Sequence, residues 1–277
     1  MKREYLYEAL ALGAFMVSAA VVTTVVEHPA LPVRAFVDDS MLRRALIGLC
    51  MALTAVSIVY SPMGRRSGAH MNPAVTLTFW RLGKMDGGEA WSYMAAQFAG
   101  GCAGLAVAAM LGGAWLADPS VAYVATLPGP WGVTAAFAAE LTISFGVMLL
   151  VLTASNNARL APYTGLLVGC LIFTCITFEA PLSGMSMNPA RTFAPMLVGG
   201  VTTPLWIYFL APPIGMLAAS EVYLRTHGLA AVRCAKLYHP DGRACIFHCA
   251  WPPPARGTSS ATPASKPANA EITAGAR

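Results

Sequence analysis

One nine-residue pattern occurs twice in this chain. Residues 68–76 read GAHMNPAVT and residues 184–192 read GMSMNPART, so each copy is a Gly, two residues, Met-Asn-Pro-Ala, one residue and a Thr. Asn is among the best helix N-caps, and Pro suits the first helical position, where no backbone N–H is needed. Each copy therefore predicts the start of a short helix, over about residues 72–82 and 188–198.

Long apolar runs surround the two copies. Of the 277 residues, 56% are hydrophobic and only 11% are charged, whereas an ordinary soluble domain has about 25% charged residues. A helix needs about 20 mainly apolar residues to cross the hydrocarbon core of a bilayer. Six runs meet this criterion, near residues 4–26, 41–61, 89–114, 131–153, 162–181 and 203–225. We expect an all-α membrane protein with six transmembrane helices and two re-entrant half-helices.

The basic residues orient the chain in the membrane. If six helices start from the cytoplasm, four cationic side chains lie on the far side: Arg34, Arg43, Arg44 and Arg191. The other 14 of the 18 Lys and Arg residues then lie on the cytoplasmic side. This asymmetry follows the positive-inside rule and predicts that both termini are cytoplasmic. The net charge of +5 is thus a topology signal, and no nucleic-acid partner is expected.

The chain divides into two halves of similar content, about residues 4–114 and 131–225. Each half has three long helices and one Asn-Pro-Ala copy, and Glu8 in the first helix has a counterpart in Glu140 in the fourth. An odd number of spans reverses the second half relative to the first. The sequence therefore predicts an inverted repeat, which places a functional site near the bilayer midplane at half-helix ends.

The two predicted half-helices define the chemistry of that site. Each is about 15 Å long, so two of them meeting tip to tip would cover the roughly 30 Å hydrocarbon core. Each N-terminal tip carries about half a positive charge. The capping bond uses the amide oxygens of Asn72 and Asn188, so we expect their NH₂ donors to face a narrow lumen. Such a waist suits neutral solutes that carry acceptor atoms and excludes cations and protons.

These paired motifs resemble those of aquaporins, which belong to the major intrinsic protein family. GAHMNPAVT and GMSMNPART carry the resemblance, which covers about residues 4–225. It implies a right-handed six-helix bundle, usually a homotetramer with one pore per subunit. It also implies that the pore motifs are Asn72, Pro73, Ala74, Asn188, Pro189 and Ala190.

The same resemblance implies a selectivity filter. Arg191 matches the filter Arg, which repels cations and donates hydrogen bonds to the solute, and an intramembrane charge is functional by default. The other filter positions in this comparison are Met51, Ile176 and Met185. Ala52 is the alternative to Met51, because the loop before the first motif is one residue longer than in common family members.

Sequence markers for the solute point in two directions. Ile176 stands where water-selective members usually have His, which makes the filter more apolar. Thr192, by contrast, stands where glycerol-conducting members usually have Asp, and Tyr208-Phe209 is similar to the water branch. We expect a passive channel for water and other small uncharged solutes. The alternative is a channel mainly for glycerol or uncharged metalloid acids.

The buried acidic residues admit two interpretations. Glu8 and Glu140 are expected to accept hydrogen bonds from the re-entrant loops, since a buried carboxylate must be paired or neutral. His70 and Gln97 are expected to help hold the loops. A coupled secondary transporter, which also uses inverted repeats, would instead need these carboxylates as an ionisable relay. No catalytic set or cofactor motif occurs in the membrane region, so neither an enzyme nor a cofactor is expected.

The C-terminal part differs in composition from the rest. We expect a channel domain over residues 1–230 and a cytoplasmic tail over 231–277, disordered from about residue 252, where Pro, Ala and Ser dominate. The tail has metal-like content, but its spacing is not a standard zinc pattern. We expect no metal ion; the candidate ligands that remain are Cys234, Cys245 and Cys249. The expected location is a bacterial-type inner or plasma membrane.

Overall fold

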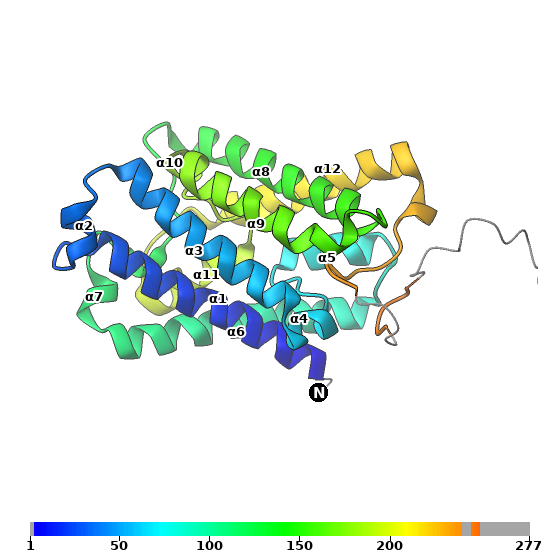
Figure 1. Ribbon diagram of the computed structural model, residues 1–277, viewed down its shortest axis with the longest axis horizontal. Coiled ribbons are helices and arrows are strands. Elements are labelled where there is room, and N and C mark those ends of the chain that lie inside the picture. Colours follow the sequence, from blue (N-terminus) through cyan, green and yellow to red (C-terminus); the bar gives the residue numbers. More distant parts are fainter. Residues whose placement is uncertain (1–2, 240–244, 250–277) are drawn as a thin grey trace, which may run out of the picture.

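The computed structural model describes residues 3–239 and 245–249 and contains no strand in that part of the chain. Six long helical segments form a bundle (Figure 1). They are α1 (Arg3–Glu27), α3 (Ser40–Tyr60), α6 (Gly87–Gly112), α8 (Gly132–Ser155), α9 (Thr164–Thr174) with its continuation, and α12 (Leu205–His227). All six are long and apolar enough to cross a membrane. The predicted all-α membrane fold is therefore confirmed.

Two short helices lie inside this bundle. They are α5 (Pro73–Arg81) and α11 (Pro189–Gly199), and each begins at the Pro of an Asn-Pro-Ala copy. Both start and end within one or two residues of the predicted ranges. The N-cap and the Pro that follows it are local signals, which is why the sequence alone locates these starts.

Short helical segments complete the connections. They are α2 (Pro32–Phe36), α4 (Pro62–Ser67), α7 (Ala114–Ala117), η1 (Ala122–Val124), η2 (Ala161–Tyr163) and η4 (Leu229–Ala231). After Thr174, α9 continues as a π-helical turn, η3 (Cys175–Glu179), and then as α10 (Ala180–Ser183). The π turn lies beside α3 at the end of the bundle opposite the N-terminus.

The helix pairs repeat between the two halves of the bundle. The first helix packs along the third, α1 on α6, and the fourth packs along the sixth, α8 on α12. The second helix of each half, α3 and α9, pack on one another. This is the arrangement expected of two halves related by a pseudo-two-fold axis.

Glycines permit the close approach of α1 and α6. A Cβ atom on Gly100 would lie 2.1 Å from the carbonyl oxygen of Ala9, and one on Gly104 would lie 2.3 Å from the carbonyl oxygen of Gly13. No larger residue fits at either position without moving a backbone. In a membrane, where helix association depends on close packing, such small residues allow the helices to interlock.

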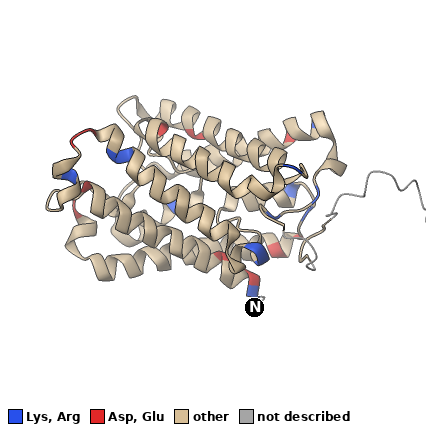
Figure 2. Ribbon diagram, in the orientation of Figure 1, with Lys and Arg blue, Asp and Glu red and all other residues tan. Residues whose placement is uncertain are grey.

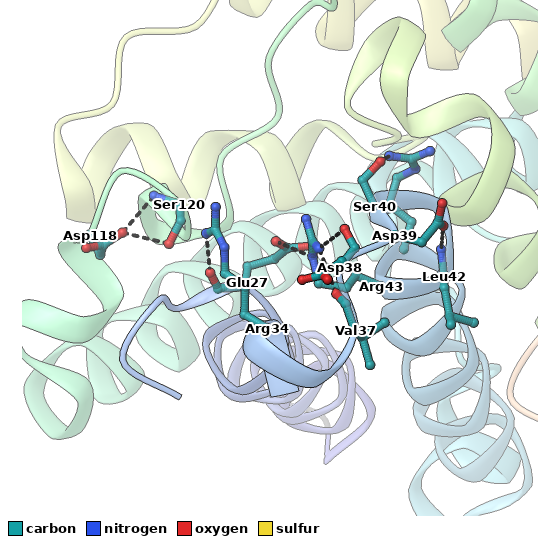
Figure 3. Close-up of polar contacts among 11 residues, drawn as sticks. Glu27, Arg34, Val37, Asp38, Asp39, Ser40, Leu42, Arg43, Asp118 and Ser120 are labelled. Atoms are coloured by element: carbon teal, nitrogen blue, oxygen red, sulfur yellow. Dashed lines mark hydrogen bonds and ion pairs between the residues drawn. The ribbon is translucent and has the colours of Figure 1, made fainter. Parts of the chain in front are cut away.

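Charged residues gather at the two ends of the bundle (Figure 2). At the end opposite the N-terminus, an ion pair of 3.0 Å joins Arg43 to Glu27 and ties α3 to α1. Arg43 also donates to the carbonyl oxygens of Val37 and Asp38, each at 2.8 Å, and Arg34 donates to that of Glu27 at 2.6 Å (Figure 3). These bonds fix the connection between the first two spans.

Candidate functional site

The two half-helices are capped by the predicted asparagines. The Asn72 side chain accepts from the backbone N–H of Ala74 at 2.9 Å. The Asn188 side chain accepts from those of Ala190 and Arg191, at 3.1 and 3.3 Å. Both Asn residues are in the extended region, as N-caps are. The two tips therefore have the capped geometry that the sequence predicts.

The amide NH₂ groups of these asparagines join the two tips. Asn72 Nδ2 donates to the carbonyl oxygen of Met187 at 2.7 Å, and Asn188 Nδ2 donates to that of Met71 at 2.7 Å. The sequence predicts NH₂ groups that face a narrow lumen, whereas one N–H of each binds the opposite loop. An amide carries two N–H donors, so one donor of each Asn stays available to the cavity that both residues line.

Glu8 on α1 holds the first re-entrant loop. Its carboxylate accepts from the Ser67 hydroxyl (2.7 Å), the backbone N–H groups of His70 (3.1 Å) and Met71 (2.7 Å), and the Gln97 amide (2.8 Å). Glu8 is fully buried. Four donors around one carboxylate leave no buried charge without partners, in keeping with the structural role expected for Glu8 and Gln97.

Glu140 on α8 holds the second loop in the same way. It accepts from the Ser183 hydroxyl at 2.9 Å and from the backbone N–H groups of Ser186 at 2.6 Å and Met187 at 2.7 Å. This carboxylate is also fully buried. The two acidic residues therefore occupy equivalent places in the inverted repeat.

The loops that these carboxylates hold have an unusual backbone. Met71 and Met187, directly before each asparagine, have φ values of 49° and 53°, and Ala69 and Met185 have values of 56° and 50°. The left-handed region costs a residue with a Cβ atom about 1–2 kcal/mol. The hydrogen bonds to Glu8 and Glu140 offset that cost.

A cavity of about 260 Å³ runs past the two tips. Most of its lining is apolar. The predicted filter residues and both capping asparagines lie on it: Met51, Asn72, Ile176, Met185, Asn188 and Arg191. Ala52, the alternative to Met51, is not on the lining. Pro73, Ala74, Pro189 and Ala190 are buried behind the tips as the first residues of the half-helices.

Arg191 is held by a loop residue that sequence reasoning missed. Its guanidinium donates to the hydroxyl of Thr126, which also accepts from the Thr192 hydroxyl at 3.2 Å. The backbone carbonyl of Thr126 accepts from the Thr203 hydroxyl at 2.6 Å. Thr126 lies between the third and fourth spans, where no motif surrounds it. Only the folded chain brings it to Arg191.

The start of the tail covers the first loop. His70 Nε2 lies 2.7 Å from the carbonyl oxygen of Ala235, so Nε2 carries the proton and Nδ1, at 3.0 Å, accepts from the Thr76 hydroxyl. The backbone N–H of Leu237 donates to the Gly68 carbonyl at 3.2 Å, and Leu237 lines the cavity. Residues of the expected tail thus pack on the channel core. The disorder predicted from about residue 252 falls outside the described residues.

The tail also gathers the cysteines that the sequence offers as metal candidates. Cys234 Sγ lies 3.5 Å from Cys245 Sγ, and Cys249 Sγ lies 3.3 Å from His239 Nε2. The hydrogen bond between the first two thiols lowers the pKa of Cys245 and raises the pKa of Cys234. The sequence spacing gave no indication that these four side chains meet.

The fold and the site define a class of membrane proteins with an inverted helical repeat and paired re-entrant half-helices. A model of the family described as Major intrinsic protein matches residues 1–223. The chain belongs to this family, which confirms the resemblance drawn from the two motifs.

The chain is similar in sequence to aquaporins of plants and archaea. The chain is 38% identical over 172 residues to Aquaporin NIP2-3 of Zea mays, a match that covers 61% of this chain and 54% of the relative. It is 36% identical over 184 residues to the Probable aquaporin AqpM of Archaeoglobus fulgidus, covering 64% of this chain and 74% of the relative. The match thus spans little more than half the length of the maize relative.

A solved structure shares the fold. The aquaglyceroporin from Plasmodium falciparum superposes with a TM-score of 0.65 at 21% sequence identity, over 80% of this chain and 94% of that chain. At this identity the likeness shows a common fold, and the solute has to be argued from the residues of this chain.

Proposed function

We propose that this protein is a passive transmembrane channel for water and other small uncharged solutes. The observation that carries the proposal is the meeting of two capped half-helix tips at one cavity, with Asn72 and Asn188 on its lining. Two fixed N–H donors where the tips meet suit a solute that offers oxygen acceptors. The names of the relatives, all aquaporins, support the same activity.

The electrostatics of the site favour exclusion of cations and protons. Both helix tips present the positive ends of their dipoles to the cavity. Arg191 adds a full positive charge on the lining, and Arg44 of α3 in the first half lies on the same lining. A water molecule that accepts from both asparagines cannot pass a proton along a continuous chain of donors. We infer that ions and protons are rejected while neutral solutes pass.

The apolar filter supports a second candidate, a channel mainly for glycerol or uncharged metalloid acids. Met51, Ile176 and Met185 all lie on the cavity lining and offer no side-chain donor and only the weakly accepting methionine sulfurs. Methionine is flexible and adapts its shape to what it contacts. A filter of this kind accommodates the carbon backbone of a small polyol while Arg191 binds its hydroxyl groups.

A third candidate, a coupled secondary transporter, has little support in the structure. Such a protein needs ionisable groups along the path. Glu8 and Glu140 are absent from the cavity lining and are occupied by the loop donors they hold. We therefore assign a structural role to the carboxylates of Glu8 and Glu140.

We further propose a placement and an assembly. Both the N-terminus and the start of the tail lie at one end of the bundle (Figure 1), and the Lys and Arg bias predicts that this end is cytoplasmic. We propose residence in an inner or plasma membrane and, by analogy with the family, a homotetramer with one pore per subunit. Cross-linking in native membranes would test the assembly.

The decisive experiment is stopped-flow light scattering on proteoliposomes. Water efflux, glycerol influx and boric acid influx are measured side by side for the wild type, for Arg191→Ala and for empty liposomes. Fast water flux without glycerol uptake supports a water channel, and uptake of both supports the apolar-filter candidate. Fluxes equal to those of empty liposomes for water, glycerol and boric acid would refute the channel.

A further inference from the structure

Two short segments of the tail close over the same histidine. The first arm comprises residues 232–239 and the second arm comprises residues 245–249. Ala235 of the first arm accepts from His70 Nε2 at 2.7 Å. Phe247 of the second arm stacks on the His70 ring, with 5.8 Å between centroids and 9° between planes. The arms therefore flank one residue of the first re-entrant loop from two directions.

Each arm contributes two potential metal ligands to one cluster. Cys234 and His239 come from the first arm, and Cys245 and Cys249 come from the second. One ligand atom of each lies within 4.8 Å of all the others. Cys234 is buried and the other three are half-buried. A cluster built equally from two arms is suited to join them.

The distances fit a tetrahedral metal site. With Zn–S bonds of about 2.3 Å, the sulfur atoms of such a site lie roughly 3.8 Å apart. The Cys234–Cys245 distance of 3.5 Å and the Cys249–His239 distance of 3.3 Å are close to that edge length. A disulfide needs about 2.05 Å between its sulfurs. Three cysteines and one histidine form a closed donor set that Zn²⁺ prefers in structural sites.

We propose that these four tail residues bind one Zn²⁺ ion: Cys234, His239, Cys245 and Cys249. The ion fastens the two arms to each other and so holds them against the first re-entrant loop. It has a structural role, because four protein ligands leave no coordination position for a substrate.

The charges around the cluster suit this site. Three thiolates and one Zn²⁺ ion carry a net charge of −1. Lys236 lies between two of the ligands in sequence, is buried, and donates from Nζ to the carbonyl oxygen of Arg65 at 2.9 Å. The Arg65 guanidinium lies 5.4 Å from the centre of the Tyr238 ring, beside the same arm. Of these two cations, Lys236 acts electrostatically on Cys245 and so offsets the negative charge of the occupied site.

The first test measures metal content. The full chain is purified in detergent with a reductant and without a chelator, incubated with Zn²⁺, desalted, and analysed by elemental mass spectrometry. We expect about one zinc per chain. Replacement of zinc by Co²⁺ should give the strong thiolate charge-transfer absorption and the visible bands of a tetrahedral site. Alkylation of the folded protein should spare Cys234, Cys245 and Cys249 until a chelator is added.

Matched variants separate the site from general thiol chemistry. Cys245→Ser and His239→Ala should bind zinc at least about 100-fold more weakly, while Cys170→Ser, an exposed cysteine on α9 outside the cluster, should bind as the wild type does. A chelator should lower the thermal midpoint of the wild type and of Cys170→Ser but not that of Cys245→Ser. Size-exclusion elution as a single folded species validates each variant.

Three results would overturn the proposal. One is a reduced, folded wild type that retains no zinc and gives no tetrahedral Co²⁺ spectrum. Another is equal zinc binding by the wild type and Cys245→Ser. If intact-mass analysis instead finds a disulfide between Cys234 and Cys245 in protein isolated without reductant, and no metal, the cluster is a redox pair and the zinc assignment fails.

Discussion

The two re-entrant loops are built on one plan but attached to different surroundings. In both, a buried glutamate from the first helix of the repeat binds two consecutive backbone N–H groups. In both, a tyrosine donates to the loop: Tyr93 to Ser67 at 2.9 Å and Tyr208 to Ser183 at 2.5 Å. The shared parts are those that hold the half-helix tips in register.

The differences lie at the outer edge of each loop. His70 and its counterpart Ser186 each bind the hydroxyl of the threonine six residues later, at 3.0 and 2.5 Å, but His70 also binds Ala235 of the tail. Val75 in the first half-helix corresponds to Arg191 in the second, which the loop residue Thr126 holds. The repeat therefore duplicates the scaffold, while the arginine of the half-helix lies in the second half and the attachment to the tail lies in the first.

The largest expected effect comes from removing a loop-holding carboxylate. Glu8→Ala and Glu140→Ala each leave two backbone N–H groups buried without an acceptor, at about 1–3 kcal/mol apiece. We expect each variant to lose most of its folded protein in detergent, measured by thermal unfolding. Glu221→Ala is the control, because its exposed ion pair with Arg81 is worth about 0–1 kcal/mol. If Glu8→Ala were as stable as the wild type, the first loop would not depend on its glutamate as the second loop does.

Substitutions at Arg191 and at the equivalent Val75 test which half-helix excludes protons. Arg191→Val makes the second tip resemble the first and removes a positive charge. The repulsion between two unit charges about 4 Å apart is about 4 kcal/mol at an effective dielectric constant of about 20, so this much of the barrier to a proton is lost. Proton flux through proteoliposomes should rise at least about tenfold. Val75→Thr at the equivalent position should leave proton flux unchanged. If both variants leak equally, Arg191 is not the barrier.

The attachment of the first loop to the tail predicts unequal effects of equivalent substitutions. His70→Ala leaves the Ala235 carbonyl without its donor and removes the stacking on Phe247, at a cost of about 2 kcal/mol. Ser186→Ala should cost about 1 kcal/mol, because it affects hydroxyl bonds within one half. Chemical denaturation in detergent compares the two. Equal losses would mean that the tail contributes nothing to the first loop.

The smallest effect concerns the support of Arg191. Thr126→Val keeps the shape of the side chain but removes the hydroxyl that Arg191 and Thr192 bind, at a cost of about 1 kcal/mol. We expect little change in stability and a measurable change in the ratio of glycerol to water flux, because the guanidinium is freed. Thr142→Val, on the exposed side of α8, serves as the control. An unchanged ratio would assign Thr126 to loop structure alone.

Local signals in the sequence predict much of this molecule. Helix lengths follow from apolar runs, and the starts of α5 and α11 follow from Asn-Pro, since a cap acts on its own helix. The positions of Glu8 and Glu140 follow from their repetition. The bond between Arg191 and Thr126, and the meeting of the four tail ligands, depend on packing between distant segments. No local pattern records such contacts, which is why sequence reasoning missed them.

The bond between His70 and Ala235 also has a consequence for biosynthesis. Its partners are 165 positions apart, so nearly the whole channel is translated before the first loop can receive its outer cover. Glu8, by contrast, precedes the loop that it holds and is available as soon as that loop emerges. A nascent chain stalled after α12 would thus contain the complete inner scaffold with His70 still uncovered. Truncations or fusions that replace the two arms should reproduce that immature state.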